Sequence, residues 1–191
     1  MRLRTLVLAI TTAVLVGAGP AQAHGGHHHR HKHHKPRAVD VQLLSINDFH
    51  GNLAPPGTLT LPGGVRTPAG GAEYLATHIK ALRAQNRNTL VVSAGDNIGA
   101  SPLVSGLFHD EPTIEAFNAM GVDISSVGNH EFDEGSSELL RMQDGGCHPL
   151  DGCQDGDGFA GADFDYLAAN VVDDDSGRTL FAHTRSAGSA A

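Results

Sequence analysis

Two short stretches, NTLVVSAGD (residues 88–96) and VDISSVGNH (residues 122–130), share one construction. Each is an apolar run rich in β-branched residues that ends in a glycine and continues into polar residues. This pattern is typical of a buried strand followed by a turn. A third apolar run, AVDVQLLSI (38–46), is followed by the polar segment NDFHGNL (47–53). We therefore expect three strands of one sheet, the first over residues 39–46.

Helical patterns separate these strands. Apolar residues recur at helical spacing in GGAEYLATHIKALRAQN (70–86), and EPTIEAFNAMG (111–121) has Pro112 in its first turn and Gly121 as a C-cap. EGSSELLRMQ (134–143) predicts a short helix and FDYLAANVVD (164–173) a fourth strand, whereas the Pro/Gly-rich residues 54–70 predict a long loop. Strands that alternate with helices indicate an α/β fold with a mainly parallel sheet.

Polar residues follow each of the first three strands. Asp48 and His50 follow the first, Asp96 the second and Asn129 the third. Ligand sites of parallel sheets lie beyond the carboxyl ends of the strands, so these side chains are expected to converge. Residues two apart in an extended segment point the same way, and a carboxylate can bridge two ions. Carboxylate, imidazole and amide oxygen are suitable ligands for Zn, Mn or Fe.

At these positions the sequence resembles a known family. The blocks NDFHGNL, GDNIGASPL (95–103) and GNHEFDEG (128–135), in this order, are similar to those of the secreted 5′-nucleotidase family of the calcineurin-like metallophosphatase superfamily. YLAANV (166–171) also resembles that family, and the resemblance extends over residues 40–173. It implies the first half of a metallophosphatase α/β-sandwich, with αββα layers.

The resemblance also implies a set of metal ligands. Asp48 and His50 would bind a first divalent ion, Asp96 would bridge it to a second, and Asn129 would bind the second. The two ions would be Zn, Mn, Fe or Co.

His130 and Asp133 would be the catalytic pair. His130 would contact the substrate phosphate or protonate the leaving oxygen, and Asp133 would pair with its ring. A carboxylate beside an imidazole raises its pKa and fixes its tautomer. We expect Glu131, between them, to be a solvated acid or an acid near a helix N-terminus.

The implied reaction is metal-assisted hydrolysis of a phosphate ester, with an extracellular nucleotide as the substrate of a 5′-nucleotidase. An alternative is a 2′,3′-cyclic phosphodiesterase, a UDP-sugar hydrolase or a sulfur-compound hydrolase of related fold. A non-enzyme alternative is an exported His-rich metal-binding protein. The formal net charge of −8 argues against a nucleic-acid polymer as partner.

The first 37 residues are expected to lie outside the fold. Residues 1–23 combine a basic start, an apolar run and an Ala-x-Ala site ending at Ala23, which indicates a cleaved signal peptide, secretion or export to the cell envelope, and no membrane span afterwards. A membrane anchor is the alternative. Residues 24–37 predict a disordered linker. Its histidines could also bind metals loosely; they are His24, His27, His28, His29, His31, His33 and His34.

Cys147 and Cys153 are the only cysteines, and export favours a small disulfide between them. A metal pair with His148 is the alternative.

Residues 38–191 are expected to form the N-terminal part of a catalytic domain. Family members carry further histidine ligands, among them a Gly-His-x-His block, that this sequence lacks. We therefore expect weak metal binding and little phosphatase activity from this chain alone.

Overall fold

The computed structural model describes residues 38–154, 156 and 158–181. The predicted signal peptide (1–23) and the His-rich linker (24–37) lie outside the described residues. All the elements given below belong to one compact unit that begins at Val39.

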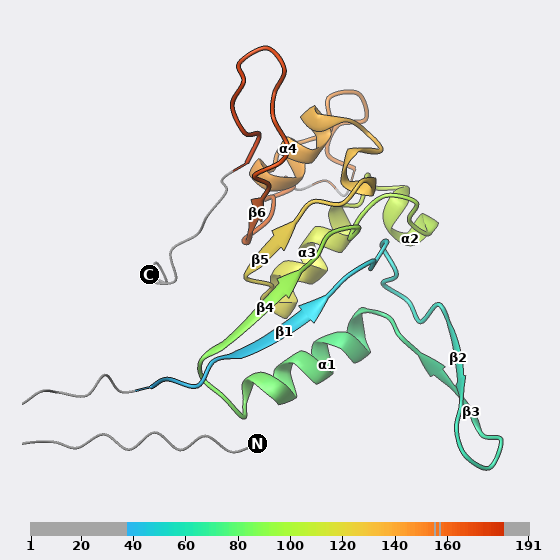
Figure 1. Cartoon of the computed structure of the whole chain (residues 1–191). Coiled ribbons are helices and arrows are strands. Elements are labelled where there is room, and N and C mark those ends of the chain that lie inside the picture. Colours follow the sequence, from blue (N-terminus) through green and yellow to red (C-terminus); the bar gives the residue numbers. More distant parts are fainter. Residues whose placement is uncertain (1–37, 155, 157, 182–191) are drawn as a thin grey trace, which may run out of the picture. The chain divides into compact units, whose positions relative to one another are not determined.

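A parallel sheet forms the centre of this unit (Figure 1). Within the described residues it has four strands in the order β1-β4-β5-β6. Their bounds are Gln42–Ile46 for β1, Thr89–Ser93 for β4, Ile124–Ser126 for β5 and Asp165–Leu167 for β6. The alternating α/β fold and the parallel sheet predicted from the sequence are confirmed.

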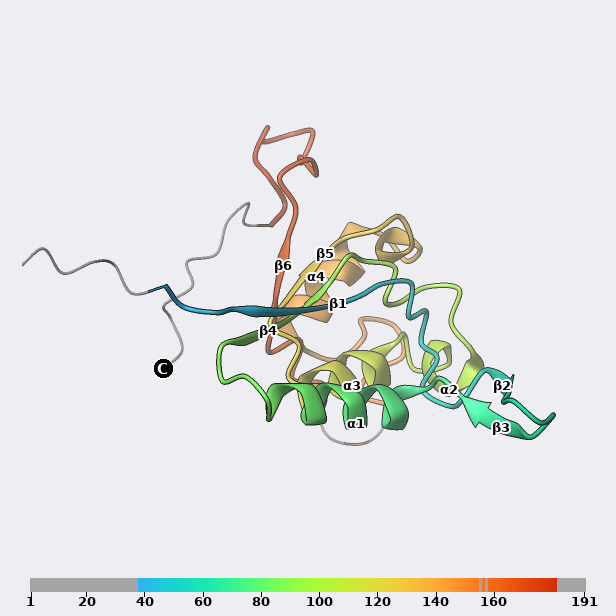
Figure 2. The same cartoon turned by 60° about the horizontal axis from the view of Figure 1, so that its bottom comes forward.

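Helices connect the strands. Helix α1 is Ala72–Arg83, α3 is Glu111–Met120 and α4 is Ser136–Asp144. The short helix α2 (Leu103–Gly106) precedes α3, and a 3₁₀ turn, η1 (His130–Phe132), follows β5. Because the strand order follows the chain and crossovers are right-handed, successive helices fall on one face of the sheet. Figures 1 and 2 show α1 and α3 together on that face.

The core lies between the sheet and these helices. Val91 of β4 packs with Ile114 and Phe117 of α3 and with Leu139 and Met142 of α4, and all five are fully buried. The fully buried rings of Phe164 and Tyr166 extend this core toward β6. Each such side chain contributes about 1.5–3 kcal/mol by leaving water.

Helix α3 begins and ends as its sequence predicts. Pro112 lies in its first turn, where a missing N–H costs nothing. Gly121 follows its last residue with φ 70°, a left-handed conformation that glycine adopts without a Cβ clash.

Two predicted segments differ from the structure. The predicted loop 54–70 is wrong, because an antiparallel hairpin of β2 (Gly57–Thr60) and β3 (Arg66–Ala69) lies within it. The hairpin could not be predicted because many Pro and Gly residues surround the short Thr/Leu alternation of β2. The predicted strand 164–173 is too long, since β6 ends at Leu167 and the chain then turns, with an isolated bridge joining Val172 to Thr179.

The opposite face of the sheet is apolar and open. Paired residues of parallel strands share a face, so Leu43 and Leu90 face away from the buried Val91. Leu43 is 62% exposed. This agrees with one half of a layered sandwich. Among the described residues, no helix has the length and apolarity needed to cross a bilayer.

Arg141 on α4 makes the main buried ionic contacts among the described residues. It donates to Glu111 on α3 at 2.5 Å, to both oxygens of Glu138 at 2.6–3.0 Å, and to the Gly146 carbonyl at 2.8 Å. Its side chain and that of Glu111 are each less than a tenth exposed.

We expect Arg141→Leu to lower the free energy of unfolding by about 3–5 kcal/mol, because it leaves buried carboxylates without their partner. Urea unfolding followed by circular dichroism measures this. The control is Arg66→Leu on the exposed hairpin, expected to change stability by about 0.5 kcal/mol or less. Equal effects of the two substitutions would contradict a buried ionic contact that stabilises α3 against α4.

Candidate active site

The loops after β1 and β4 are held together by backbone hydrogen bonds. Asp48 N–H donates to the Gly95 carbonyl at 3.1 Å, and His50 N–H to the Asp96 carbonyl at 3.1 Å. These bonds continue the pairing of the two strands beyond their carboxyl ends. The polar residues that follow each strand are thereby fixed side by side.

Asp48, His50 and Asp96 converge at this edge. One ligand atom from each lies within 4.8 Å of the others. His50 Nδ1 lies 2.9 Å from the Gly99 carbonyl, which can only accept, so Nδ1 carries the proton and Nε2 keeps its lone pair. A ring fixed in this way is prepared for metal binding. These are three of the four ligands expected from the sequence.

All three residues have left-handed backbones, with φ 50° at Asp48, 45° at His50 and 52° at Asp96. Such conformations are uncommon for non-glycine residues and cost about 1–3 kcal/mol each when they are strained. The surrounding hydrogen bonds maintain them. Left-handed residues of this kind cluster at functional sites.

The loops after β4 and β5 approach each other closely because glycines form the contact. A Cβ on Gly128 would lie 2.2 Å from Asp96 Oδ1, and one on Gly95 would lie 2.4 Å from the Gly128 nitrogen. The glycines in GDN and GNH are therefore required by backbone contact. His130 N–H then donates to Asp96 Oδ1 at 2.9 Å.

Glu131 has a role that the sequence reasoning missed. Its side chain is buried, with 2% of the residue exposed. Its carboxylate accepts the backbone N–H groups of Asp96 at 2.9 Å, Asn97 at 2.8 Å and Gly128 at 2.6 Å. Of the two expected roles, that of a solvated acid is wrong, because the loops after β4 and β5 point these donors inward at the carboxylate. Glu131 does lie in the first turn of a helix, the 3₁₀ turn η1, as the other alternative expected.

Asn129 and His130 lie at the start of η1. Asn129 is exposed, and its carbonyl accepts Phe132 N–H at 3.2 Å. The His130 ring lies edge-on to the His50 ring with centroids 4.8 Å apart, so His130 is a neighbour of the ligand cluster.

Asp133 pairs with His130. His130 Nδ1 and Asp133 Oδ2 are 2.8 Å apart, and the 3₁₀ turn makes this three-residue spacing possible. The hydrogen bond to Asp133 raises the pKa of His130. A Cβ on Gly99 would lie 2.6 Å from Asp133 Oδ2, so the loop after β4 also borders this pair.

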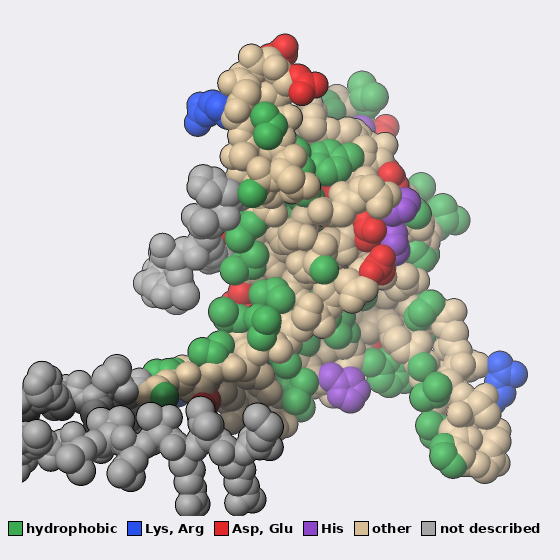
Figure 3. All heavy atoms as spheres, in the orientation of Figure 1, with side chains coloured by type: hydrophobic (Ala, Val, Ile, Leu, Met, Phe, Trp, Pro, Cys, Tyr) green, Lys and Arg blue, Asp and Glu red, His purple; other side chains and the backbone are tan. Residues whose placement is uncertain are grey.

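A cavity of about 270 Å³ lies beside these residues. Its lining includes Gly99, His130, Glu131, Asp133, His109 and Glu134. Figure 3 shows histidine and acidic side chains gathered at this edge, beyond the carboxyl ends of the strands. The arrangement provides metal ligands, a carboxylate-paired imidazole and space for a small substrate group.

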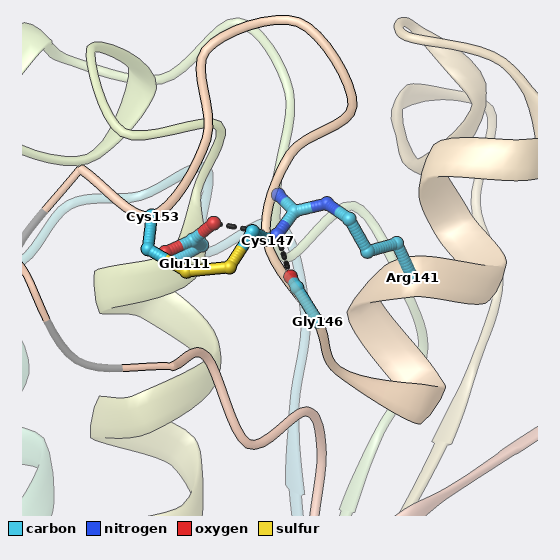
Figure 4. Close-up of a disulfide and its surroundings, with 5 residues drawn as sticks. All are labelled: Glu111, Arg141, Gly146, Cys147 and Cys153. Atoms are coloured by element: carbon cyan, nitrogen blue, oxygen red, sulfur yellow. Dashed lines mark hydrogen bonds and ion pairs between the residues drawn. A yellow bond between two sulfur atoms is a disulfide. The ribbon is translucent and has the colours of Figure 1, made fainter.

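Cys147 and Cys153 form a disulfide in the loop after α4 (Figure 4). Their sulfurs are bonded to each other, so they do not form a metal pair with His148 in this structure. His148 instead lies against His109 in a second cluster of histidines and acids, which no sequence motif indicated.

We expect Glu131→Gln to lower the free energy of unfolding by about 1–3 kcal/mol, because an amide N–H₂ group would then face buried N–H donors. Chemical unfolding checks this value. Glu73→Gln, the same change on the exposed surface of α1, is the control and should be nearly neutral. A neutral result for both would show that the loops do not depend on the carboxylate.

Residues 41–186 match the Calcineurin-like phosphoesterase family, Metallophos. An uncharacterized protein from the pqq-V 5′ region of Acinetobacter calcoaceticus is 50% identical over 152 residues, which are 74% of each chain. Endonuclease YhcR of Bacillus subtilis is 42% identical over 69% of this chain and 11% of its own length. A 2′,3′-cyclic-nucleotide 2′-phosphodiesterase/3′-nucleotidase of Yersinia enterocolitica is 31% identical over 75% of this chain and 20% of its own length.

Solved structures agree. NAD nucleotidase (NadN) of Haemophilus influenzae superposes with a TM-score of 0.57 at 28% identity, over 75% of this chain and 23% of that one. The 5′-nucleotidase precursor of Thermus thermophilus superposes with a TM-score of 0.56 at 28% identity, over 74% of this chain and 25% of that one. The chain thus spans a quarter or less of these two nucleotidases. The family match over most of the sequence, together with the 50% identical relative, shows that this chain belongs to the calcineurin-like phosphoesterase family.

Proposed function

We propose that this protein is a metal-dependent phosphoester hydrolase that acts on nucleotides, and that its activity is that of a 5′-nucleotidase. The observation that carries the proposal is the convergence of Asp48, His50 and Asp96 beside the His130–Asp133 pair. The first group can hold cations and the second can donate a proton. Phosphoester hydrolysis uses both.

The donor set is of a kind that holds divalent ions, and we propose two. Asp48 and His50 would hold the first, Asp96 would contact both, and Asn129 would offer its amide oxygen to the second. Asp96 uses Oδ1 to accept His130 N–H, and a carboxylate oxygen has further lone pairs for a cation. When bound, such ions polarise a phosphoryl oxygen and lower the pKa of a water molecule.

We propose that His130 acts on the phosphate. Asp133 accepts from Nδ1, which directs Nε2 away from that carboxylate, and raises the pKa of His130 so that the ring keeps its proton nearer to neutral pH. The ring can then hydrogen-bond a phosphate oxygen or protonate the leaving alcohol. Glu131 is buried and acts as a positioning residue for Asp96 and Gly128.

Nucleotides are the proposed substrates because the NAD nucleotidase and the 5′-nucleotidase precursor share this fold at 28% identity. The Yersinia relative supports a second candidate, hydrolysis of 2′,3′-cyclic nucleotides. The net charge of −8 disfavours a nucleic-acid polymer as substrate.

We also propose export through residues 1–23, on the strength of their signal-peptide pattern.

Two substitutions in the Mn²⁺-loaded chain distinguish the proposed metal ligand from the proposed proton donor. Asp96→Asn should lower bound metal at this site, because it removes the bridging charge. His130→Ala should leave metal content unchanged and lower turnover of 5′-AMP by about 10²–10⁴-fold, the usual contribution of a positioned acid or base. Elemental analysis and a phosphate-release assay measure the two quantities, with 2′,3′-cyclic AMP as the second substrate.

Phosphate affinity provides a readout when turnover is low. Calorimetric titration of Mn²⁺-loaded chain with inorganic phosphate should show weaker binding in His130→Ala, whereas His78→Ala on the exposed surface of α1 should match the parent chain. Loss of metal from His130→Ala would reassign it as a ligand. Unchanged metal content in Asp96→Asn would overturn the proposed site. Rapid hydrolysis of 5′-AMP by this chain alone would contradict the expectation of low activity.

A further inference from the structure

A second cluster of potential metal ligands borders the cavity through His109, Glu134 and Glu138. His109, Glu134, Glu138 and His148 each place one ligand atom within 4.8 Å of the others. They come from four separate segments: the turn before α3, the turn after η1, helix α4 and the disulfide loop. None of them belongs to the Asp48–His50–Asp96 cluster.

The two imidazoles form the centre of this cluster. The rings of His109 and His148 stack with centroids 3.7 Å apart and an interplanar angle of 11°. Their side chains are only 17% and 11% exposed. Two imidazoles are thus brought together where solvent has little access.

Carboxylates surround His109. Nδ1 lies 2.7 Å from Glu134 Oε2, and Nε2 lies 2.9 Å from Asp151 Oδ2. A ring whose two nitrogens both face carboxylates donates from both and is therefore cationic. Burial alone lowers the pKa of His109, but the hydrogen bonds to Asp151 and Glu134 outweigh this effect and raise it. An ion bound to His109 Nδ1 would take the place of the proton between this atom and Glu134.

Glu138 is fixed from behind. Arg141 donates to both of its oxygens at 2.6–3.0 Å, and its side chain is 11% exposed. Arg141 offsets one of the negative charges at the cluster, and a carboxylate retains lone pairs for a further partner. Two imidazoles and two carboxylates are therefore gathered within reach of one ion. Because each imidazole lone pair lies in the plane of its ring, the stacked rings must turn to share that ion, and His148 Nδ1 must give up the N–H of Asp151 that it now accepts if it binds through that atom.

We propose that His109, His148, Glu134 and Glu138 bind one Zn²⁺ ion at a site separate from the proposed catalytic metals. Two imidazoles with carboxylate oxygens form a donor set that zinc accepts in four-coordinate sites. Asp151 supports it from outside, because it accepts the Nε2 proton of His109 and leaves Nδ1 for the ion on the side of Glu134. Carboxylates that orient a metal-binding histidine in this way are common around zinc.

The disulfide holds one side of this site. His148 and Asp151 lie between Cys147 and Cys153, and Arg141 donates to the carbonyl of Gly146 just before that loop (Figure 4). The loop is therefore attached covalently at its base and by Arg141 to α4. Replacement of both cysteines by serine frees the segment that carries His148 and Asp151 without adding thiol ligands, and zinc affinity should then fall.

The test isolates this site in the full chain. The seven histidines of the 24–37 tract are replaced by serine, and Asp48→Asn with Asp96→Asn disables the proposed catalytic ligands. Calorimetric titration of the EDTA-treated, desalted chain with Zn²⁺ should then show one equivalent bound. His148→Ala on the disulfide loop should abolish this binding, and Asp151→Asn should weaken it by about 10–100-fold, as expected for a supporting carboxylate.

Matched controls separate the site from general effects. His78→Ala and Glu73→Gln, both on the exposed surface of α1, should leave zinc affinity unchanged. Cys147→Ser with Cys153→Ser should weaken binding. Circular dichroism and the urea midpoint of each metal-free variant show whether it is folded, and Asp151→Asn keeps the test decisive if His148→Ala unfolds.

Two results would overturn the proposal. One is the absence of stoichiometric Zn²⁺ binding in the chain with the tract and catalytic ligands removed. The other is zinc binding that persists with equal affinity in folded His148→Ala and Asp151→Asn. Neither result bears on the proposed hydrolase, because two of its proposed ligands, Asp48 and Asp96, are replaced in the tested chain.

Discussion

The site depends on one buried carboxylate, that of Glu131. Three backbone N–H groups, from Asp96, Asn97 and Gly128, point at its two oxygens. Hydrogen bonds to an ionised acceptor are shorter and roughly twice as strong as neutral ones. Because the donors belong to the loops after β4 and β5 and the acceptor to η1, this one group fixes three segments. Without it, buried N–H groups would have no partner, and the left-handed Asp96 would lose a constraint that maintains it.

The parallel sheet explains why such a constraint is needed at this place. Parallel strands deliver their carboxyl ends to one edge, so loops that carry functional groups meet there. The hydrogen bonds of a sheet stop with the strands, however, and the loops have to be joined by other means. Here the backbone bonds of Asp48 and His50 join the first loop to the second, and Glu131 joins the second to the third. The ligand cluster is therefore as rigid as the sheet edge on which it lies.

Much of this could be predicted from the sequence, and the reasons are local. Apolar runs that end in Gly-Asp and Gly-Asn-His located the strands, and strand order brought Asp48, His50 and Asp96 together. Glu131 could not be predicted in the same way. A glutamate after Asn-His has the same pattern whether its carboxylate meets water or N–H groups, because the direction of those donors is set by the turns of Gly95 and Gly128.

The second cluster was beyond sequence reasoning for a related reason. His109 and His148 are far apart in the sequence, and their contact depends on how α3 packs against α4 and how the disulfide loop folds back. Histidines that are not spaced like metal ligands form no recognisable sequence motif, so only the tertiary structure shows that these two residues meet.

The placement of this cluster has a physical consequence for the cavity. Its lining includes Asp133 and Glu134 as well as Glu131, and the chain is acidic, so an anionic phosphate entering it meets unfavourable charge. Cations bound by Asp48, His50 and Asp96, as we propose, would offset this charge. A zinc ion held by His109 and Glu134, which line the cavity, would add to that effect. With both sites occupied, fixed positive charge near the His130 imidazole would favour an anionic substrate, and stabilisation of this kind lowers the barrier to phosphoryl transfer.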